Sequence, residues 1–398
     1  MNYRILILAG LIGLFFSCER EMSPEQSQKF IKFFGEYSVD LATDLAVLDN
    51  GGFAICGIAT SPDSGSRMAF YITDEYGNPK PGFPRYYTMA GFNSGANAMV
   101  AIRGGLGGYL LCGYVEDPDG TATPPKDLFI VRTSSDGEEI WKRRYGSSED
   151  ESILHAEEGI SSGFILSGYQ VRDGKRDIMV MGLRDEGDSL ELSLNYKNLY
   201  SDNASANYIL NTGDRYLCAC TYNTIYSDDS DILILILNDE LSYNVEFLEG
   251  NFDESACCII PDGAERYLVL GNRVNVSGKS EMLVYLIETN GLLVTNSLLL
   301  ATISERNSDL HARRFVKTED GGFAIVGTRT AEGNQDLFLQ FLTEDYQVGD
   351  RILFGSLGNQ TGIDVGLPTG GGLLMLGTNS YEGNSMFSLI KTDDSGSL

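Results

Sequence analysis

The sequence predicts an all-β protein, a seven-bladed β-propeller closed by pairing an N-terminal and a C-terminal strand in the last blade. Three observations lead to this prediction. The 398 residues include 46 Gly, 21 Tyr and 19 Phe but only 10 Pro, a composition that favours short strands joined by tight turns. One apolar motif recurs seven times. The last copy is incomplete, and its missing strand has a counterpart near the N-terminus.

The repeated motif is a short apolar run that follows a turn. Its third residue recurs every 50 to 56 positions, at Phe53, Tyr109, Phe164, Tyr216, Tyr267, Phe323 and Leu373. A second apolar run follows each copy after a polar loop, as in DLFIVRTSSDG, and most copies continue with a third run such as EIWKRRYG and a fourth such as ESILHAEEG. Each copy therefore supplies four strands.

The middle strands of each copy are apolar almost without interruption, which indicates burial on both faces. Four-stranded units of this kind, repeated four to eight times, are typical of propeller blades. A β-solenoid or a pair of stacked sandwiches is the structural alternative. A solenoid needs no split repeat, however, and sandwiches would not keep one spacing throughout.

The two ends of the chain complete one another. The last copy stops after its second run at SLIKTDDSGSL, whereas residues 29–47 match the third and fourth runs of a complete copy. We therefore expect Phe30–Phe34 to form the outermost strand of the final blade and residues 41–48 the innermost strand of the first. This pairing would close the ring and protect strand edges that invite aggregation.

The N-terminus is predicted to be a targeting signal. Arg4 precedes an apolar run from Ile5 to Phe16, which is too short to span a bilayer. The Ser-Cys pair after two phenylalanines resembles the lipobox of bacterial lipoproteins, and the resemblance implies that Cys18 carries the lipid. The expected organisation is a signal peptide over 1–17, a polar tether over 18–28 and one propeller domain over 29–398. The expected location is the cell envelope, lipid-anchored in the outer membrane on an undetermined face; a plain secreted protein is the alternative.

The repeat unit also resembles a family of repeat-containing lipoproteins and surface proteins of Bacteroidota. The similarity rests on units such as GGYLLCG followed by DLFIVRTSSDG and EIWKRRYG, and it extends over residues 29–398. The resemblance implies the fold but no specific activity. Tryptophan-docked blades are not expected, because Trp141 is the single tryptophan.

Net charge and residue inventory exclude several functions. Lys and Arg total 29 against 56 Asp and Glu, a net charge of -27 that repels phosphate backbones and disfavours nucleic-acid binding. With only two histidines, His155 and His311, a three-histidine zinc centre is excluded. No nucleophile elbow, in which the serine of a G-x-S-x-G sequence lies between a strand and a helix, is visible.

An acidic or amide residue recurs near the start of each predicted inner strand. If the registers agree, these residues ring one mouth of the central channel and could bind calcium or a polyhydroxyl ligand. The favoured alternative is that each one caps its own turn through nearby backbone amides. Calcium is the one cofactor considered. The seven residues are Asp40, Asn97, Glu151, Asn203, Asp253, Asp309 and Asp364.

Two further groups are candidates for ligand binding. His311 and Arg313 alternate along an inner strand and could enter the channel to meet the acidic ring or an anionic ligand; structural ion pairing is the alternative. Tyr222 and Tyr226 belong to a long predicted loop and could stack on sugars; the alternative is that these loop tyrosines bind no ligand. The six cysteines that follow Cys18 match no metal motif and are expected to be mostly free, buried thiols.

The leading functional hypothesis is a non-catalytic binding or scaffolding propeller, attached to the bilayer through acylated Cys18, with a glycan or an envelope protein as partner. One alternative is a glycan hydrolase or lyase that uses carboxylates at the channel mouth, because such chemistry needs only two carboxylates. The other is an envelope-assembly scaffold. The sequence leaves the question of catalysis open and favours its absence.

Overall fold

The structure is a computed structural model that describes residues 29–398 except 36–38, 64, 104–106, 119–125, 147–148, 187–188, 194–202, 224–228, 249 and 251. For strand residues between 185 and 193 only the backbone is described. The predicted signal peptide, the tether and Cys18 lie outside these residues. The described chain is all-β, as the sequence predicts, and within it no helix could cross a membrane.

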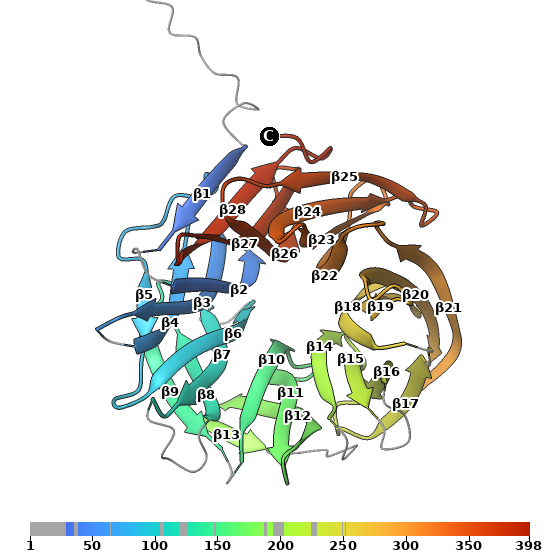
Figure 1. Ribbon diagram of the computed structural model, residues 1–398. Helices are drawn as coiled ribbons and strands as arrows, with labels where there is room; N and C mark the ends of the chain where they lie inside the picture. The colour runs from blue at the N-terminus through green and yellow to red at the C-terminus, as the bar shows by residue number, and fades with distance from the viewer. Residues whose placement is uncertain are drawn as a thin grey trace, which may run out of the picture.

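The strands form five four-stranded sheets and one eight-stranded sheet, arranged in a ring around a central opening (Figure 1). All pairings within the four-stranded sheets are antiparallel between consecutive strands. The first three of these sheets are β6 (Asn93–Ala101), β7 (Tyr109–Glu116), β8 (Lys126–Thr133) and β9 (Glu139–Tyr145); β10 (Glu151–Glu158), β11 (Phe164–Arg172), β12 (Lys175–Glu186) and β13 (Ser189–Ser193); and β14 (Ser205–Asn211), β15 (Tyr216–Asn223), β16 (Ser230–Leu237) and β17 (Tyr243–Leu248).

The next two sheets continue this pattern towards the C-terminus. They are β18 (Glu254–Gly263), β19 (Arg266–Val274), β20 (Ser280–Asn290) and β21 (Leu293–Ile303); and β22 (Asp309–Lys317), β23 (Phe323–Ala331), β24 (Asn334–Leu342) and β25 (Val348–Phe354). In each sheet the first strand lies nearest the central opening and the last lies at the outside (Figure 1).

The sixth four-stranded unit and a seventh are joined in the eight-stranded sheet. One half is β2 (Val39–Val47), β3 (Phe53–Ser61), β4 (Gly65–Ile72) and β5 (Arg85–Tyr87); the other is β26 (Asn359–Gly366), β27 (Leu373–Tyr381) and β28 (Asn384–Thr392) with β1 (Phe30–Phe34). A single parallel pair, Val39 with Ser385, connects the halves. This leaves five separate sheets plus two halves, an arrangement compatible with seven blades.

The N-terminal strand lies where the split repeat predicts. β1 pairs antiparallel with β28, from Phe30 opposite Lys391 to Phe34 opposite Phe387. Phe34 is buried and packs on Tyr71, with ring centroids 5.4 Å apart. Lys29 adds a 2.7 Å ion pair with Asp393. The outer edge of β28 is therefore covered by a strand from the other end of the chain.

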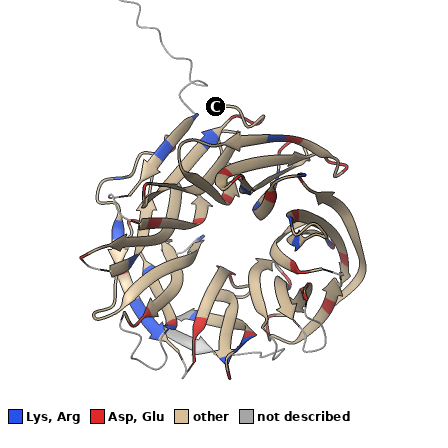
Figure 2. Cartoon of the chain, in the orientation of Figure 1, with Lys and Arg blue, Asp and Glu red and all other residues tan. Residues whose placement is uncertain are grey.

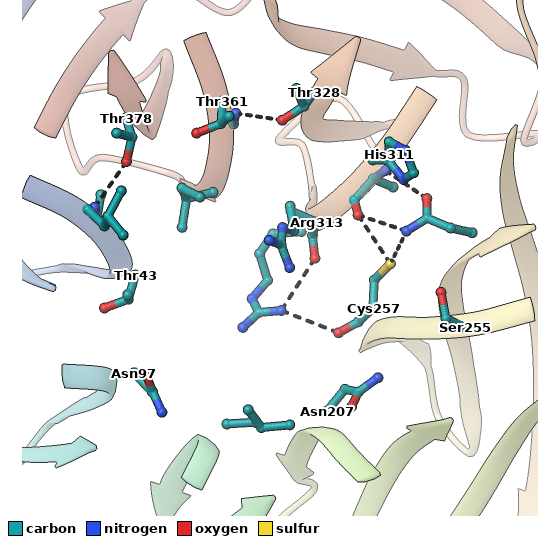
Figure 3. A pocket seen from close by; sticks show the side chains of 18 of the residues that line it. Thr43, Asn97, Asn207, Ser255, Cys257, His311, Arg313, Thr328, Thr361 and Thr378 are labelled. Carbon is teal, nitrogen blue, oxygen red and sulfur yellow. Dashed lines mark hydrogen bonds between the residues drawn. The ribbon is translucent and has the colours of Figure 1, made fainter. Parts of the chain in front are cut away.

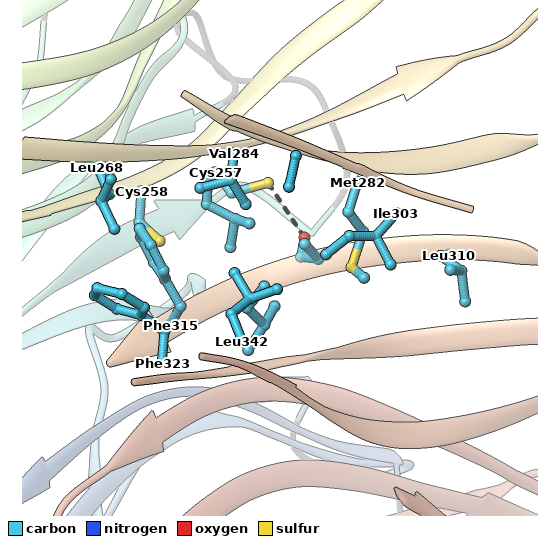
Figure 4. Close-up of a cluster of buried hydrophobic side chains, with 14 of the residues drawn as sticks. Cys257, Cys258, Leu268, Met282, Val284, Ile303, Leu310, Phe315, Phe323 and Leu342 are labelled. Atoms are coloured by element: carbon cyan, nitrogen blue, oxygen red, sulfur yellow. Dashed lines mark hydrogen bonds between the residues drawn. The ribbon is translucent and has the colours of Figure 1, made fainter. Parts of the chain in front are cut away.

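Apolar side chains fill the spaces between neighbouring sheets. The buried residues of the described chain form seven hydrophobic clusters, each shared by two adjacent four-stranded units. Figure 4 shows one of them, where Cys258 and Leu268 meet Phe315 and Phe323. Each fully buried side chain of this size contributes about 1.5–3 kcal/mol. The third residues of all seven motif copies belong to this core.

Each innermost strand carries a β-bulge at the same place. The register slips by one residue in β2, β6, β10, β14, β18, β22 and β26. The extra residue has no partner on the second strand, so its side chain can turn towards the opening. The seven bulge residues are Thr43, Asn97, Leu154, Asn207, Cys257, Arg313 and Ile363.

The last glycine of the motif packs against the residue that precedes the bulge. Gly113 lies opposite Ala96, and a Cβ atom at Gly113 would overlap the carbonyl oxygen of Gly95. We expect Gly113→Ala to lower the free energy of unfolding by about 1–3 kcal/mol, because the strand must shift to admit the methyl group. Urea unfolding measures this loss. Gly182→Ala is the matched control, since nothing lies within 4 Å of its added Cβ; equal losses in both variants would contradict the explanation.

Candidate functional site

A cavity of about 800 Å³ occupies the central opening. All seven innermost strands contribute to its wall, each through its bulge residue. Figure 3 shows Thr43, Asn97, Asn207, Cys257 and Arg313 around the open centre. The bulges therefore determine which side chains a ligand in the cavity would meet.

Most of the wall is neutral and polar, and many of its groups already hold neighbouring strands together. Asn97 donates to the carbonyl oxygen of Ile153 at 2.8 Å, and Asn207 donates to that of Ala256 at 2.8 Å. Thr378 accepts from the amide of Ala42 at 3.0 Å. These contacts fix the wall in place, as expected for a preformed site.

The charged side chains in the wall are basic. Among the described residues that line the cavity there is no Asp or Glu, whereas His311, Arg313 and Arg314 all contribute. The rest of the chain is acidic overall, and Figure 2 shows charges of both signs all around the ring. The cavity therefore differs in charge from the molecule that encloses it.

Arg313 and His311 both reach the cavity from β22. Arg313 is exposed, and within the described part of the chain no carboxylate lies at ion-pair distance from its guanidinium. His311 shares a 3.2 Å hydrogen bond between Nδ1 and Ser280 Oγ. Burial lowers the pKa of His311, and the charge of Arg313 lowers it further. The positive charge that this strand brings to the cavity at neutral pH therefore comes from its arginines.

Two carboxyl groups meet beside the cavity. Asp44 and Asp364 occupy the position after the bulge in β2 and β26 and retain 6% and 9% exposure, and both accept from the backbone amide of Leu45, at 3.1 and 3.2 Å. Backbone amides hold both: Met99 donates to Asp44 Oδ2 at 2.6 Å, and Leu45 donates to Asp364 Oδ2 at 3.2 Å. The pair is therefore fixed at the junction of three inner strands.

Burial and mutual repulsion favour one shared proton in this pair. Burial raises the pKa of Asp44 well above its usual value, and the Asp364 carboxylate raises it further. Burial also raises the pKa of Asp364, while Arg314 opposes that rise. Two carboxyls in contact cannot both ionise without a large cost, so one remains protonated.

Arg314 links the carboxyl pair to the cavity. It lines the cavity and donates from Nη1 to the carbonyl oxygen of Cys257 at 3.3 Å. Its guanidinium lies 4.7 Å from the ring centre of Tyr208, which stacks on His155 at 3.8 Å. The negative charge of the pair is the main influence that raises the pKa of Arg314 against the cost of burial.

The predicted acidic ring is not assembled, because its seven members occupy different positions along the inner strands. Asn97 is a bulge residue, whereas Asp364 follows a bulge. Asp40 and Glu151 are buried at the starts of their strands, before the bulge, and Glu151 accepts from Gln170 at 2.7 Å. Measured from the bulge, Asn203, Asp253 and Asp309 lie four residues before it, and Asp40 and Glu151 lie three residues before it, so the seven positions are not equivalent.

The residues at the start of the inner strands instead bond to the preceding four-stranded unit. Asn203, Asp253 and Asp309 accept from the backbone amides of Arg176, Ser230 and Ser280 at 3.3, 3.2 and 2.9 Å. Asn93, Asp150 and Asn359 do the same for Ser66, Lys126 and Gln335. These side chains cap backbone amides, as the favoured alternative expects, but across an interface rather than within their own turns.

The tyrosine hypothesis is wrong for Tyr222, which belongs to β15 rather than to an exposed loop. Its side chain is buried and packs on Phe247, with ring centroids 5.0 Å apart. Tyr226 lies outside the described residues. The calcium hypothesis stays a prediction, and no three His, Cys, Asp or Glu side chains cluster as a metal site in the described ranges.

The cysteines after Cys18 are free and buried, as the sequence predicts. Cys257 also lines the cavity, where it donates to the carbonyl oxygen of Ala312 at 3.2 Å. Burial raises the pKa of the Cys257 thiol to about 11, so it is protonated at neutral pH.

Sequence reasoning missed Asp44 and Arg314 and placed Asp364 in the wrong set. One signal was available: in five of the seven copies the bulge residue lies ten positions before the third motif residue, as Thr43 does before Phe53. Alignment on that offset would have brought Asp44, Arg314 and Asp364 into one column. Their contact across the opening was not visible in any local pattern.

Comparison with known proteins defines the fold. No protein-family model matches the chain, and no curated protein matches it. Among solved structures, a puromycin hydrolase matches with 8% identity and a TM-score of 0.53, over 90% of this chain and 52% of its own. A Hadza microbial sialidase matches with 8% identity and a TM-score of 0.50, over 91% of this chain and 66% of its own. The β-propeller domain of the Trilobed protease from Pyrococcus furiosus matches with 12% identity and a TM-score of 0.47, over 89% of this chain and 94% of its own.

These likenesses show a β-propeller. The chain spans about half the length of the puromycin hydrolase it matches. The expectation of a non-catalytic binding or scaffolding propeller is corrected by this comparison, because the two better matches are by name a puromycin hydrolase and a sialidase. The hydrolytic alternative agrees better with them, although identities this low show the fold alone.

Proposed function

We propose that this protein is a hydrolase whose reaction centre is the carboxyl pair Asp44 and Asp364. The observation that carries the proposal is that both carboxyls, next in sequence to Thr43 and Ile363 in the wall of a charged, polar cavity, accept from the backbone amide of Leu45. A pair of carboxyls that shares one proton contains an acid and a base at the same place. Such a pair can hydrolyse a bond without a metal ion or a nucleophilic side chain.

The contact between the carboxyls suits hydrolysis of an ester or amide. The Asp364 carboxylate takes a proton from a water molecule as that water adds to the acyl carbon, and the Asp44 carboxyl gives its proton to the acyl oxygen. When the tetrahedral intermediate collapses, the proton gained by Asp364 passes to the leaving group, and the acyl oxygen returns its proton to Asp44. The pair is then restored.

Glycan hydrolysis is the second candidate, because the threonine, serine and asparagine groups of the wall suit sugar hydroxyls. The carboxyls of glycosidases are usually about 5–10 Å apart, on opposite sides of the scissile bond. Asp44 and Asp364 touch, which is why acyl hydrolysis is preferred here.

We also propose that the ring has seven blades, with the eight-stranded sheet counted as two and β1 completing the last. The seven interfacial clusters and the β1 to β28 pairing support this count. The lipid anchor at Cys18 and the location in the envelope remain proposals from the sequence alone.

The test is a turnover screen of the purified protein on chromogenic acyl esters, anilides and glycosides. We expect Asp364→Asn and Asp44→Asn each to lower kcat/KM by about 100-fold or more, the usual contribution of a positioned acid or base. As pH is varied, activity should peak between the two ionisations of the Asp44 and Asp364 pair, because the reaction needs one proton on the pair.

Asp150→Asn is the matched control. Asp150 caps the amide of Lys126, and asparagines already perform that role at positions 93, 203 and 359. Unchanged turnover in this variant, beside loss in the other two, supports the proposal. Turnover that survives both Asp44→Asn and Asp364→Asn, or a screen with no turnover on any substrate class, overturns it.

A further inference from the structure

We propose that the central cavity recognises a free carboxylate on its ligand, of the kind found at the end of a peptide or an N-acyl amino acid, and that Arg313 binds it. This inference names the substrate class for the proposed hydrolase and rests on that function. The inference starts from the positive charge of Arg313, which the fold places in the cavity without a carboxylate at ion-pair distance among the described residues.

The position of Arg313 is set by the bulge in β22. The register slips between Ala312 and Arg314, and Arg313 is the residue without a partner on β23. At the six equivalent bulges the wall carries Thr, Asn, Leu, Cys or Ile, so none supplies a carboxylate to this arginine. Arg313 lies close enough to His311 and Cys257 for its charge to lower the pKa of both groups.

Arg314 differs from Arg313 in having its partners within the protein. It contacts Tyr208, the carbonyl oxygen of Cys257 and the electrostatic field of the Asp44 and Asp364 pair. With one proton shared by the two aspartates, the pair carries one negative charge, which Arg314 balances. The charge of Arg313 remains for a ligand.

A guanidinium group favours a carboxylate ligand because its parallel N–H groups match the two oxygens. The cavity volume of about 800 Å³ falls within the range of ordinary small-molecule sites. β22 and β26 are neighbouring inner strands in contact, and both Arg313 and Ile363, the residue before Asp364, line the cavity. A substrate anchored at Arg313 therefore extends past the carboxyl pair.

The experiment compares N-acetyl-L-alanine with N-acetyl-L-alaninamide by calorimetric titration. The two probes have nearly the same size, and only the first carries a charge. We expect the acid to bind at least about tenfold more tightly than the amide, which corresponds to a difference of about 1.4 kcal/mol. Added salt should weaken binding of the acid and leave that of the amide unchanged.

The variants assign the effect to Arg313. We expect Arg313→Gln to remove the preference for the acid without changing the thermal midpoint, and Arg313→Lys to retain part of it. Equal affinity for both probes, an unchanged preference in Arg313→Gln, or no saturable binding of either probe overturns the inference.

The same titrations separate this inference from the proposed hydrolysis. Asp364→Asn should abolish turnover and still bind the acid more tightly than the amide. If the preference depends on Arg313 but the protein hydrolyses nothing in the screen, the hydrolase proposal fails and the carboxylate site stands. If turnover depends on Asp364 but the two probes bind equally, the carboxylate site fails and the hydrolase proposal stands.

Discussion

Arg314→Met is expected to lower the free energy of unfolding by about 3 kcal/mol at neutral pH, the usual cost of removing one partner from a buried charged group. Methionine keeps much of the volume of the side chain but leaves the charge on Asp44 and Asp364 without its counter-ion. Urea unfolding followed by the fluorescence of Trp141 measures the change.

The loss should depend on pH in a definite direction. Burial raises the pKa of both aspartates, so in the folded state their protonated forms are favoured, and the stability they contribute is lost as pH rises through their folded pKa values. Arg314 opposes this loss by stabilising the ionised form. The difference between wild type and Arg314→Met should therefore be smallest near pH 4, where the carboxyls hold their protons, and should grow towards neutral pH.

Arg313→Met is the matched control for Arg314→Met. It makes the same substitution one residue away, at an exposed side chain with no carboxylate at ion-pair distance in the described chain. We expect its stability to stay within about 0.5 kcal/mol of wild type. The explanation by charge balance would be wrong if the two variants lost similar free energies of unfolding. It would also be wrong if the loss from Arg314→Met did not vary with pH.

A chain that begins at residue 36 should unfold at a much lower denaturant concentration and associate in solution. Removing β1 takes away the buried ring of Phe34, a loss of about 3–5 kcal/mol on its own, and leaves the backbone groups of β28 unpaired. Unfolding curves and light scattering measure the two effects.

A chain that begins at residue 29 separates the strand from the segment before it. It retains β1 and the ion pair between Lys29 and Asp393, so it should match the full chain in stability and remain dispersed. If the chain starting at residue 36 is equally stable and equally dispersed, β1 does not protect the edge of β28.

The sequence was sufficient to predict strand content, the repeat and the location of β1, because these depend on local apolar patterns and on a spacing that recurs seven times. Phe30–Phe34 was assigned with the bounds found in the structure. Tyr222 was misplaced because the strand β15 continues three residues beyond the motif, into sequence that reads as loop.

The site was harder to predict because it depends on one-residue irregularities. Asp364 and Asp253 seemed equivalent by counting, yet one contacts Asp44 beside the opening and the other caps Ser230 at a sheet interface. A bulge changes the direction of every side chain that follows it, and its position is set by pairing with the next strand. Function was the least accessible, since Asp44 and Asp364 are separated by nearly the whole chain.

The shared bulge has a consequence for how this protein can change over evolution or by design. Positions 43, 97, 154, 207, 257, 313 and 363 have no partner on the second strand, so a new side chain at any of them leaves the ladder of backbone hydrogen bonds intact. Threonine, asparagine, leucine, cysteine, arginine and isoleucine already occupy the same place in different copies. Specificity can therefore be varied one copy at a time, and a combinatorial library at these seven codons would sample new binding chemistries on an unchanged scaffold.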